Sequence, residues 1–136
     1  MASTAVRPGF ITAFKIASHA VTLLVILQAV LAGMFISGEQ ADAKDQHELM
    51  ANVIVVAVVI QLLLAFLIRG WGQFRLLYWV GVLLVLSVAQ VGLGYASRDD
   101  TLPEAIHIPL GVFLFGLALV ISILAVLEDR PRGTAA

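Results

Sequence analysis

Two histidines, each followed one helical turn later by a small residue, are the side chains of this sequence best suited to metal chemistry. Ala51 follows His47 by four residues, and Gly111 follows His107 at the same spacing. In a helix this spacing places the small residue on the same face as the imidazole, so a flat group can lie against that face. Imidazole nitrogen is a common axial ligand of haem iron. The pattern therefore predicts that His47 and His107 are metal ligands, with Ala51 and Gly111 leaving room for a porphyrin.

The two histidines belong to two similar halves of the chain. The segment LQAVLAG around Gln28 resembles AQVGLGY around Gln90, and HELMANVIVV from His47 resembles HIPLGVFLFG from His107. Gln28 precedes His47 by 19 residues, and Gln90 precedes His107 by 17 residues. We therefore expect an internal repeat of two helices. Hydrogen bonding between helices accounts for Gln28 and Gln90 without a cofactor, and contact with a haem edge is the alternative interpretation.

Four long apolar segments must position these residues. Hydrophobic residues make up 61% of the 136 residues and charged residues only 12%, which is typical of a membrane protein rather than a soluble domain. Each segment is close to the roughly 20 residues that cross a bilayer as a helix. We expect a single transmembrane domain over residues 1–136 in contact with the lipid bilayer. The predicted spans are residues 14–38, 46–68, 75–97 and 104–128.

The predicted fold class is an all-α, integral membrane, up-down four-helix bundle with an internal two-helix pseudo-repeat. Short connections make successive helices antiparallel, so the second and fourth helices begin on the same side and lie diagonally across the bundle. Neighbouring axes about 8–10 Å apart imply a diagonal of roughly 11–14 Å. His47 and His107 would then lie at the same depth and could reach one metal between them.

Charge predicts the orientation in the membrane. Most Lys and Arg residues fall in the two tails and in the connection between the second and third spans, which favours a multi-pass protein of the cell membrane with both termini in the cytoplasm. Lys44 and Arg98 are the only cations on the outer side, so we expect them to pair with haem propionates that point outward. The net charge of −1 does not suggest a nucleic-acid partner.

Other chemistries find less support in the residue types. The chain has no cysteine, which excludes a thiolate metal site and covalent c-type haem attachment. A zinc site requires three or four ligands, and a conduit of two haems requires four histidines where three are present. His19 has no equivalent in the repeat, because Gly81 lies at that position, and we expect His19 to be a hydrogen-bonded packing residue. A histidine near a membrane surface can also be an interfacial polar residue without a ligand.

The order of these features resembles one half of haem A synthase. The resemblance is carried by Gln28 with Leu31-Ala-Gly33, by His47, by Gln90 with Leu93-Gly94, and by His107. That family has two four-helix halves, each with a histidine pair on its second and fourth helices at the outer side of the membrane. One half holds a b-type haem and the other holds the haem substrate. The resemblance therefore implies that His47 and His107 are haem ligands.

Two departures from that family bear on activity. The synthase pattern has a glutamate three residues before the first histidine and an arginine just after it, where this chain has Lys44 and Glu48. The chain also has one half where the synthase has two, so haem modification would require a homodimer. Small, uncharacterised four-span prokaryotic membrane proteins with the same histidine pattern are a closer likeness.

Three hypotheses follow from the sequence. The first is a membrane-embedded cytochrome with one haem b (iron protoporphyrin IX), which exchanges single electrons with a quinone or a redox protein. The second is a haem-modifying enzyme related to haem A synthase that acts as a homodimer. The third is a cofactor-free accessory subunit of a larger membrane complex. The sequence leaves open whether the protein is an enzyme and assigns no catalytic residue.

Overall fold

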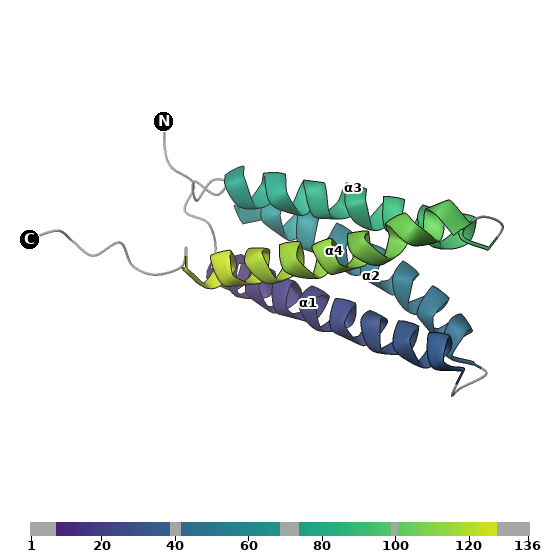
Figure 1. Cartoon of the computed structure of the whole chain (residues 1–136). Coiled ribbons are helices and arrows are strands. Elements are labelled where there is room, and N and C mark those ends of the chain that lie inside the picture. Colours follow the sequence, from purple (N-terminus) through teal and green to yellow (C-terminus); the bar gives the residue numbers. More distant parts are fainter. Residues whose placement is uncertain (1–7, 39–41, 69–73, 99–100, 128–136) are drawn as a thin grey trace, which may run out of the picture.

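The chain forms four long α-helices (Figure 1). The computed structural model describes residues 8–38, 42–68, 74–98 and 101–127, and no strand occurs within these ranges. The helices are α1 (Pro8–Ser37), α2 (Ala43–Ile68), α3 (Phe74–Ala96) and α4 (Thr101–Leu127). Each helix begins before its predicted span, and three of the four end one residue earlier than predicted. The predicted spans are limited by charged residues, whereas backbone hydrogen bonding continues the helix past such residues.

Local sequence explains how the helices begin and end. Pro8 is the first helical residue of α1, a position where the missing amide hydrogen costs nothing. Gly38 follows the last residue of α1 with a φ of 72°, and its amide donates to the carbonyl of Phe35 at 3.2 Å. A glycine at this position adopts the left-handed conformation without steric cost, which ends the helix. Asp45 and Glu104 lie in the first turns of α2 and α4, where a negative charge interacts favourably with the helix dipole and stabilises the helix.

The helices pack as an up-down bundle with each helix beside two others. The packed pairs are α1 with α2, α2 with α3, α3 with α4, and α4 with α1. Helices α2 and α4 are therefore diagonal, as predicted. The first residues of α1 and the last residues of α4 lie at the same end of the bundle (Figure 1). Figure 1 also shows the first part of α4, the stretch that contains Pro109, turning toward α3.

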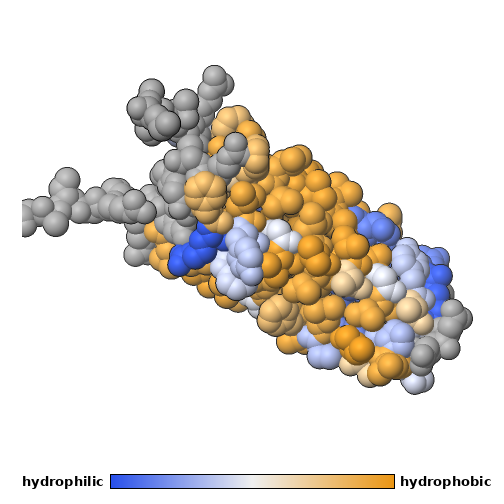
Figure 2. Space-filling model, turned by 90° about the horizontal axis from the view of Figure 1, so that it is seen from above, coloured by the Kyte–Doolittle hydropathy of each residue, from blue (hydrophilic) through white to orange (hydrophobic). Residues whose placement is uncertain are grey.

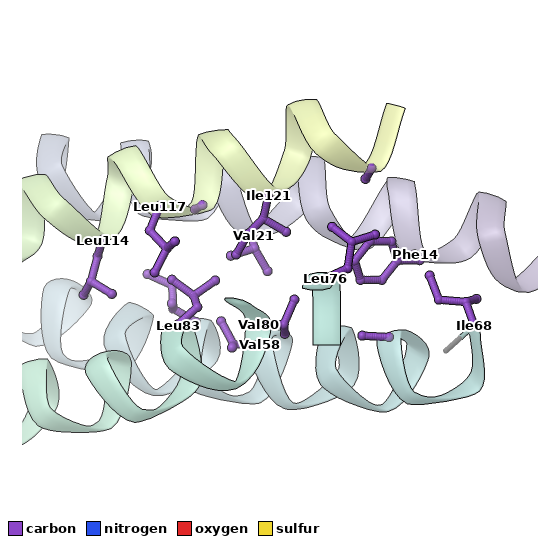
Figure 3. Packing of buried hydrophobic residues seen from close by; sticks show 14 residues of the cluster. Phe14, Val21, Val58, Ile68, Leu76, Val80, Leu83, Leu114, Leu117 and Ile121 are labelled. Carbon is purple, nitrogen blue, oxygen red and sulfur yellow. The ribbon is translucent and has the colours of Figure 1, made fainter. Parts of the chain in front are cut away.

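The hydrophobic core occupies the half of the bundle that contains the start of α1. Its fully buried side chains interdigitate between all four helices (Figure 3). Within the described residues, this cluster reaches no further than Val21 in α1 and Leu83 in α3. Its buried members in α2 and α4 begin at Ile54 and Leu114, and the partly buried Met50 and Leu110, each three residues after a histidine, pack against the cluster. The half that holds both histidines has fewer buried apolar side chains, among them Leu31 and Ala43.

Buried positions confirm the internal repeat. The spacing between equivalent buried residues is 62 residues from α1 to α3 and 60 residues from α2 to α4, the same as the spacings from Gln28 to Gln90 and from His47 to His107. The fold is thus a four-helix bundle built from two similar helical hairpins. The equivalent buried pairs are Phe14 and Leu76, Val21 and Leu83, Ile54 and Leu114, Val58 and Ala118, and Ala65 and Ala125.

The outer surface of the bundle suits a lipid environment. All four helices are long and apolar enough to cross a membrane. Large apolar side chains such as Ile16, Leu63, Val85 and Val112 are exposed on all four helices. Figure 2 shows a broad apolar surface with hydrophilic residues gathered toward the ends of the bundle. Because water would not tolerate so large an apolar surface, these features identify a multi-pass membrane protein.

Candidate functional site

The two predicted ligand histidines lie side by side within the bundle. Their ring centres are 6.3 Å apart, and the planes of the rings are inclined at 64°. His47 comes from the second turn of α2 and His107 from the second turn of α4, and both are partly buried. The diagonal placement of α2 and α4 therefore does bring the two imidazoles together, while His19 lies elsewhere in the molecule.

Gln28 and His47 are joined by a reciprocal pair of hydrogen bonds. The side-chain amide of Gln28 (Nε2) donates to the backbone carbonyl of His47 at 3.0 Å. The Nδ1 atom of His47 lies 3.2 Å from the backbone carbonyl of Gln28. A carbonyl oxygen can only accept a hydrogen bond, so Nδ1 of His47 carries the proton. Each residue thus binds the main chain of the other, which ties α1 to α2 at this depth.

Gln90 and His107 repeat this arrangement in the second hairpin. The amide of Gln90 (Nε2) donates to the backbone carbonyl of His107 at 2.8 Å. The Nδ1 atom of His107 donates to the backbone carbonyl of Gln90 across 3.1 Å. Hydrogen bonding between helices, one of the two interpretations of these glutamines, is therefore confirmed. Their contact with a haem edge stays a prediction.

The hydrogen bonds from Nδ1 place the lone pair of each histidine on Nε2, the nitrogen that metals commonly bind, and in His47 the Gln28 amide lies 3.2 Å from this atom. A neutral imidazole with its proton on Nδ1 has its lone pair on Nε2. Metal-bound histidines commonly donate their other ring nitrogen to a backbone carbonyl, which sets the tautomer and the direction of the ring. In this protein, the backbone carbonyls of Gln28 and Gln90 accept the hydrogen bonds from Nδ1 of His47 and His107. Both rings are thus held in the Nδ1-protonated form, and their role as metal ligands stays a prediction.

The donor set fits one haem iron between the rings. With metal–nitrogen bonds of about 2.0–2.1 Å and ring centres about 1 Å behind the nitrogens, two imidazoles on opposite sides of one metal have centres about 6 Å apart. The observed separation of 6.3 Å agrees with this value. In the described part of the chain, no group of three or more His, Cys, Asp or Glu side chains could hold a metal ion. That the two imidazoles share one haem iron stays a prediction.

The glycines near the site accommodate the Gln–His pairs. A Cβ atom on Gly111 would lie 3.2 Å from Nε2 of Gln90, so the space at Gly111 holds the Gln90 amide. The predicted contact of Ala51 and Gly111 with a porphyrin stays a prediction. A Cβ atom on Gly94 would lie 3.1 Å from Cε1 of His107, so the His107 ring packs closely against the backbone of Gly94. Sequence reasoning did not assign Gly94 to the site, although its position one turn after Gln90 is a signal that could have done so.

Two oxygen atoms beside the histidines have no hydrogen-bond partner within the described ranges. They are the side-chain oxygens (Oε1) of Gln28 and Gln90, and both are buried. Buried amide oxygens are normally paired, because an unpaired polar atom loses its hydration without compensation. A polar ligand or a bound water at this depth would satisfy them.

Of the two predicted propionate partners, Arg98 has other contacts and Lys44 is exposed. Arg98 forms an ion pair with Glu48 of α2, and its guanidinium lies 4.8 Å from the centre of the Tyr95 ring. Lys44 lies in the first turn of α2. Because Glu48 directly follows His47 in the chain, this ion pair lies at the level of His47. A propionate would have to compete with Glu48 for Arg98.

His19 lies on the other half of the molecule. Its Nδ1 atom donates to the backbone carbonyl of Lys15 at 2.7 Å, so the expected hydrogen bond is confirmed, whereas the expected packing role is wrong because the side chain is exposed. The ring lines an open apolar cleft of about 360 Å³ between α1 and α4, together with Thr22 and Ser122. Gln61 is fully buried in the same half and donates to the hydroxyl of Ser18 at 2.9 Å.

The arrangement of residues is therefore a pair of imidazoles at the junction of two equivalent hairpins, each oriented by a glutamine of the preceding helix. No family model, curated protein or solved structure matches this chain.

Proposed function

We propose that this protein is a membrane-embedded b-type haem protein in which His47 and His107 ligate one iron from opposite sides. The observation that carries the proposal is the pair of imidazoles from diagonal helices with ring centres 6.3 Å apart, each with its Nδ1 proton held by a backbone carbonyl. Such an arrangement costs an integral membrane protein free energy, because ionisable side chains are expensive at membrane depth and are usually retained for function.

The distribution of buried side chains supports a cofactor in the same half of the bundle. Fully buried apolar residues of the main cluster stop about two helical turns short of both histidines. A haem is a large, flat and mostly apolar molecule. Bound between His47 and His107, it would replace the apolar packing that the chain itself supplies in the other half.

One-electron transfer is the chemistry that this proposal favours. A bound haem would supply one-electron exchange between ferric and ferrous iron. His47 and His107 would hold the iron, and two imidazole ligands favour electron transfer over binding of a substrate at the metal. Gln28 and Gln90 hold the rings in one tautomer, so no proton has to move on the ligands when an electron is exchanged. The electron partner in this proposal is a quinone or a redox protein.

The location proposed for the haem is the outer side of the cell membrane, with both termini in the cytoplasm. This orientation rests on the excess of Lys and Arg in the two tails of the sequence and in the connection between the second and third spans. Resemblance to one half of haem A synthase adds to the proposal, since the histidine pair of that family has the same place on the second and fourth helices.

The experiment is absorption spectroscopy of the full chain purified in detergent after expression with haem supply. We expect a Soret band together with sharp α and β bands after reduction, as two histidine ligands produce. His47→Ala and His107→Ala should each abolish the sharp bands, because one axial position is lost. His19→Ala is the matched control, because it removes an imidazole that lies away from the site, and should leave the spectrum unchanged.

The possible outcomes of this experiment distinguish the three hypotheses. Absence of haem from the wild-type protein would support the cofactor-free subunit and overturn the proposal. Sharp bands of full intensity in either His47→Ala or His107→Ala would refute this pair of ligands. Conversion of the haem to another type on co-expression would favour the haem-modifying homodimer, and mass analysis of extracted haem measures it.

A further inference from the structure

The two Gln–His pairs differ in one contact. Besides its bond to the carbonyl of His47, the Gln28 amide (Nε2) lies 3.2 Å from Nε2 of His47. Because the same amide nitrogen donates to a carbonyl, it is a donor, and its second hydrogen is available to the Nε2 lone pair of His47. The described atoms of Gln90 and His107 form no equivalent bond. The metal-binding lone pair is thus engaged in His47 and not in His107.

A difference between Ala51 and Gly111 explains the unequal contacts. Both residues follow their histidine by four positions, so they occupy equivalent sites of the repeat. The Gln90 amide lies only 3.2 Å from where a Cβ on Gly111 would be. Ala51 has this Cβ, which takes the space that the amide uses in the second hairpin. The Gln28 amide consequently lies closer to the ring of His47.

A second difference holds the ring of His107 more firmly. The His107 ring packs against Gly94, where a Cβ would lie 3.1 Å from Cε1, 3.6 Å from Nδ1 and 3.9 Å from Nε2. The equivalent position in the first hairpin, four residues after Gln28, is Ala32. The methyl group of Ala32 prevents His47 from packing as closely against the backbone of α1. His107 is therefore the better-anchored of the two rings.

We propose that His47 and His107 are unequal ligands, with His107 the permanent ligand of the haem iron and His47 an exchangeable one whose place a neutral diatomic molecule can take. This inference rests on the proposed function. When His47 leaves, its iron–nitrogen bond breaks, the bond from iron to the incoming molecule forms, and no electron is transferred. The lone pair released on Nε2 of His47 then accepts the hydrogen of the Gln28 amide, which stabilises the released state.

The size of the expected effect follows from that hydrogen bond. A neutral hydrogen bond contributes a net 0.5–1.5 kcal/mol, so its loss shifts the exchange equilibrium by roughly threefold to tenfold. Removal of the Gln28 amide should therefore strengthen His47 as a competitor and weaken binding of the external ligand by that factor. The hydrogen bond on the other side, from Gln90, has no such influence because it does not contact Nε2 of His107.

The experiment is titration of the reduced, haem-loaded full chain with carbon monoxide, followed by the shift of the Soret band. Gln28→Leu and Ala51→Gly should each lower the affinity for carbon monoxide by about threefold to tenfold. Ala51→Gly makes room for the Gln28 amide to move away from His47 without removing that amide. It therefore tests the same hydrogen bond if Gln28→Leu does not fold. Asn52→Leu is the control, because it removes an exposed amide of α2 that binds only the backbone carbonyl of Glu48 in its own helix, and it should leave the affinity unchanged.

The histidine variants provide a second measurement. His47→Ala should retain haem with one axial ligand and bind carbon monoxide more tightly, whereas His107→Ala should lose haem during purification. Equal haem retention by the two variants, or an affinity for carbon monoxide that neither Gln28→Leu nor Ala51→Gly lowers, would overturn the inequality. Either result leaves the proposed haem site intact.

A measurement without haem separates the two proposals. In the haem-free protein, the Nε2 of His47 accepts a hydrogen bond that Nε2 of His107 lacks, so their nitrogen-15 chemical shifts should differ. Gln28→Leu should bring the shift of His47 close to that of His107. Equal shifts in the wild-type protein would overturn the inference, while a failure to bind haem at all would instead overturn the proposed function.

Discussion

At the scale of single residues, the two histidines are oriented by main-chain atoms of a neighbouring helix. The Nδ1 proton of His47 is directed at the carbonyl of Gln28, and that of His107 at the carbonyl of Gln90. Backbone carbonyls cannot be removed by a side-chain substitution, so the glutamine side chains act by keeping the two helices in register. Their amides do this by binding the carbonyls of the histidines.

Gly94 should be the most sensitive small residue near the site. Gly94→Ala places a methyl group 3.1 Å from Cε1 of His107, closer than an ordinary van der Waals contact, so the ring has to shift by a few tenths of an ångström. We expect weaker haem retention and a shifted reduction potential, which spectroelectrochemical titration measures.

The matched control for that substitution lies on the same helix. Gly92→Ala adds the same methyl group where a Cβ meets nothing within 4 Å, and it should stabilise the helix by roughly 0.5–1 kcal/mol. An equal fall of haem retention in Gly94→Ala and Gly92→Ala would show that the close contact between Gly94 and the His107 ring is not required for haem binding.

At the scale of the helices, polar contacts within each hairpin outnumber those between the hairpins near the site. The Gln28–His47 pair joins α1 to α2, and the Gln90–His107 pair joins α3 to α4. The ion pair between Glu48 of α2 and Arg98, which lies in the turn just after α3, joins the two hairpins. The separation of His47 from His107 depends on how the hairpins pack, so this ion pair can influence the distance between the two imidazoles.

Breaking the ion pair should have a small effect on stability and a larger one on the site. Both side chains are partly exposed, so the coupling between Glu48→Gln and Arg98→Gln in a double-mutant cycle should be at most about 1 kcal/mol. Unfolding of the detergent-solubilised protein by a denaturing detergent measures this coupling.

The same variants test Arg98 as a propionate partner. If Arg98 binds a propionate, Arg98→Gln should lower haem retention while Glu48→Gln raises it, because the carboxylate of Glu48 no longer competes. Equal haem retention in both variants would contradict that assignment.

At the scale of the whole molecule, the bundle is divided into a packed half and a polar half. Fully buried apolar residues from Phe14 to Ala125 fill the half that contains the start of α1 and the end of α4 (Figure 3). The histidines and their glutamines lie in the other half. This division gives one end of the molecule the rigidity of a core, and the cofactor proposed above would complete the other end.

The orientation of this axis in the membrane is a testable property. The chain has no cysteine, so a single introduced thiol reports its own position. Asp42→Cys lies at the histidine end and Phe74→Cys at the opposite end, and both side chains are exposed. We expect a membrane-impermeant thiol reagent added to intact cells to label Asp42→Cys and not Phe74→Cys, because the excess of Lys and Arg keeps the second site in the cytoplasm. The reverse pattern would show that the protein is inverted.

Much of this protein could be predicted from the sequence. Apolar segments of about 20 residues have no stable alternative to helices in a bilayer, so the four helices and their approximate limits follow from composition. The repeat places Gln28 and Gln90, and His47 and His107, at equivalent positions, and short connections make α2 and α4 diagonal. The sequence therefore predicts that the two histidines meet.

Tertiary structure alone decided which atoms meet within that plan. The sequence does not show that the glutamine amides bind the carbonyls of the histidines, that Gly94 seats His107, or that Gly111 makes room for the Gln90 amide. These contacts depend on the rotation of each helix about its axis and on shifts of less than one residue. Hydropathy and spacing cannot resolve such details, because nearly every residue around them is apolar and only the packing of side chains between the helices determines the register.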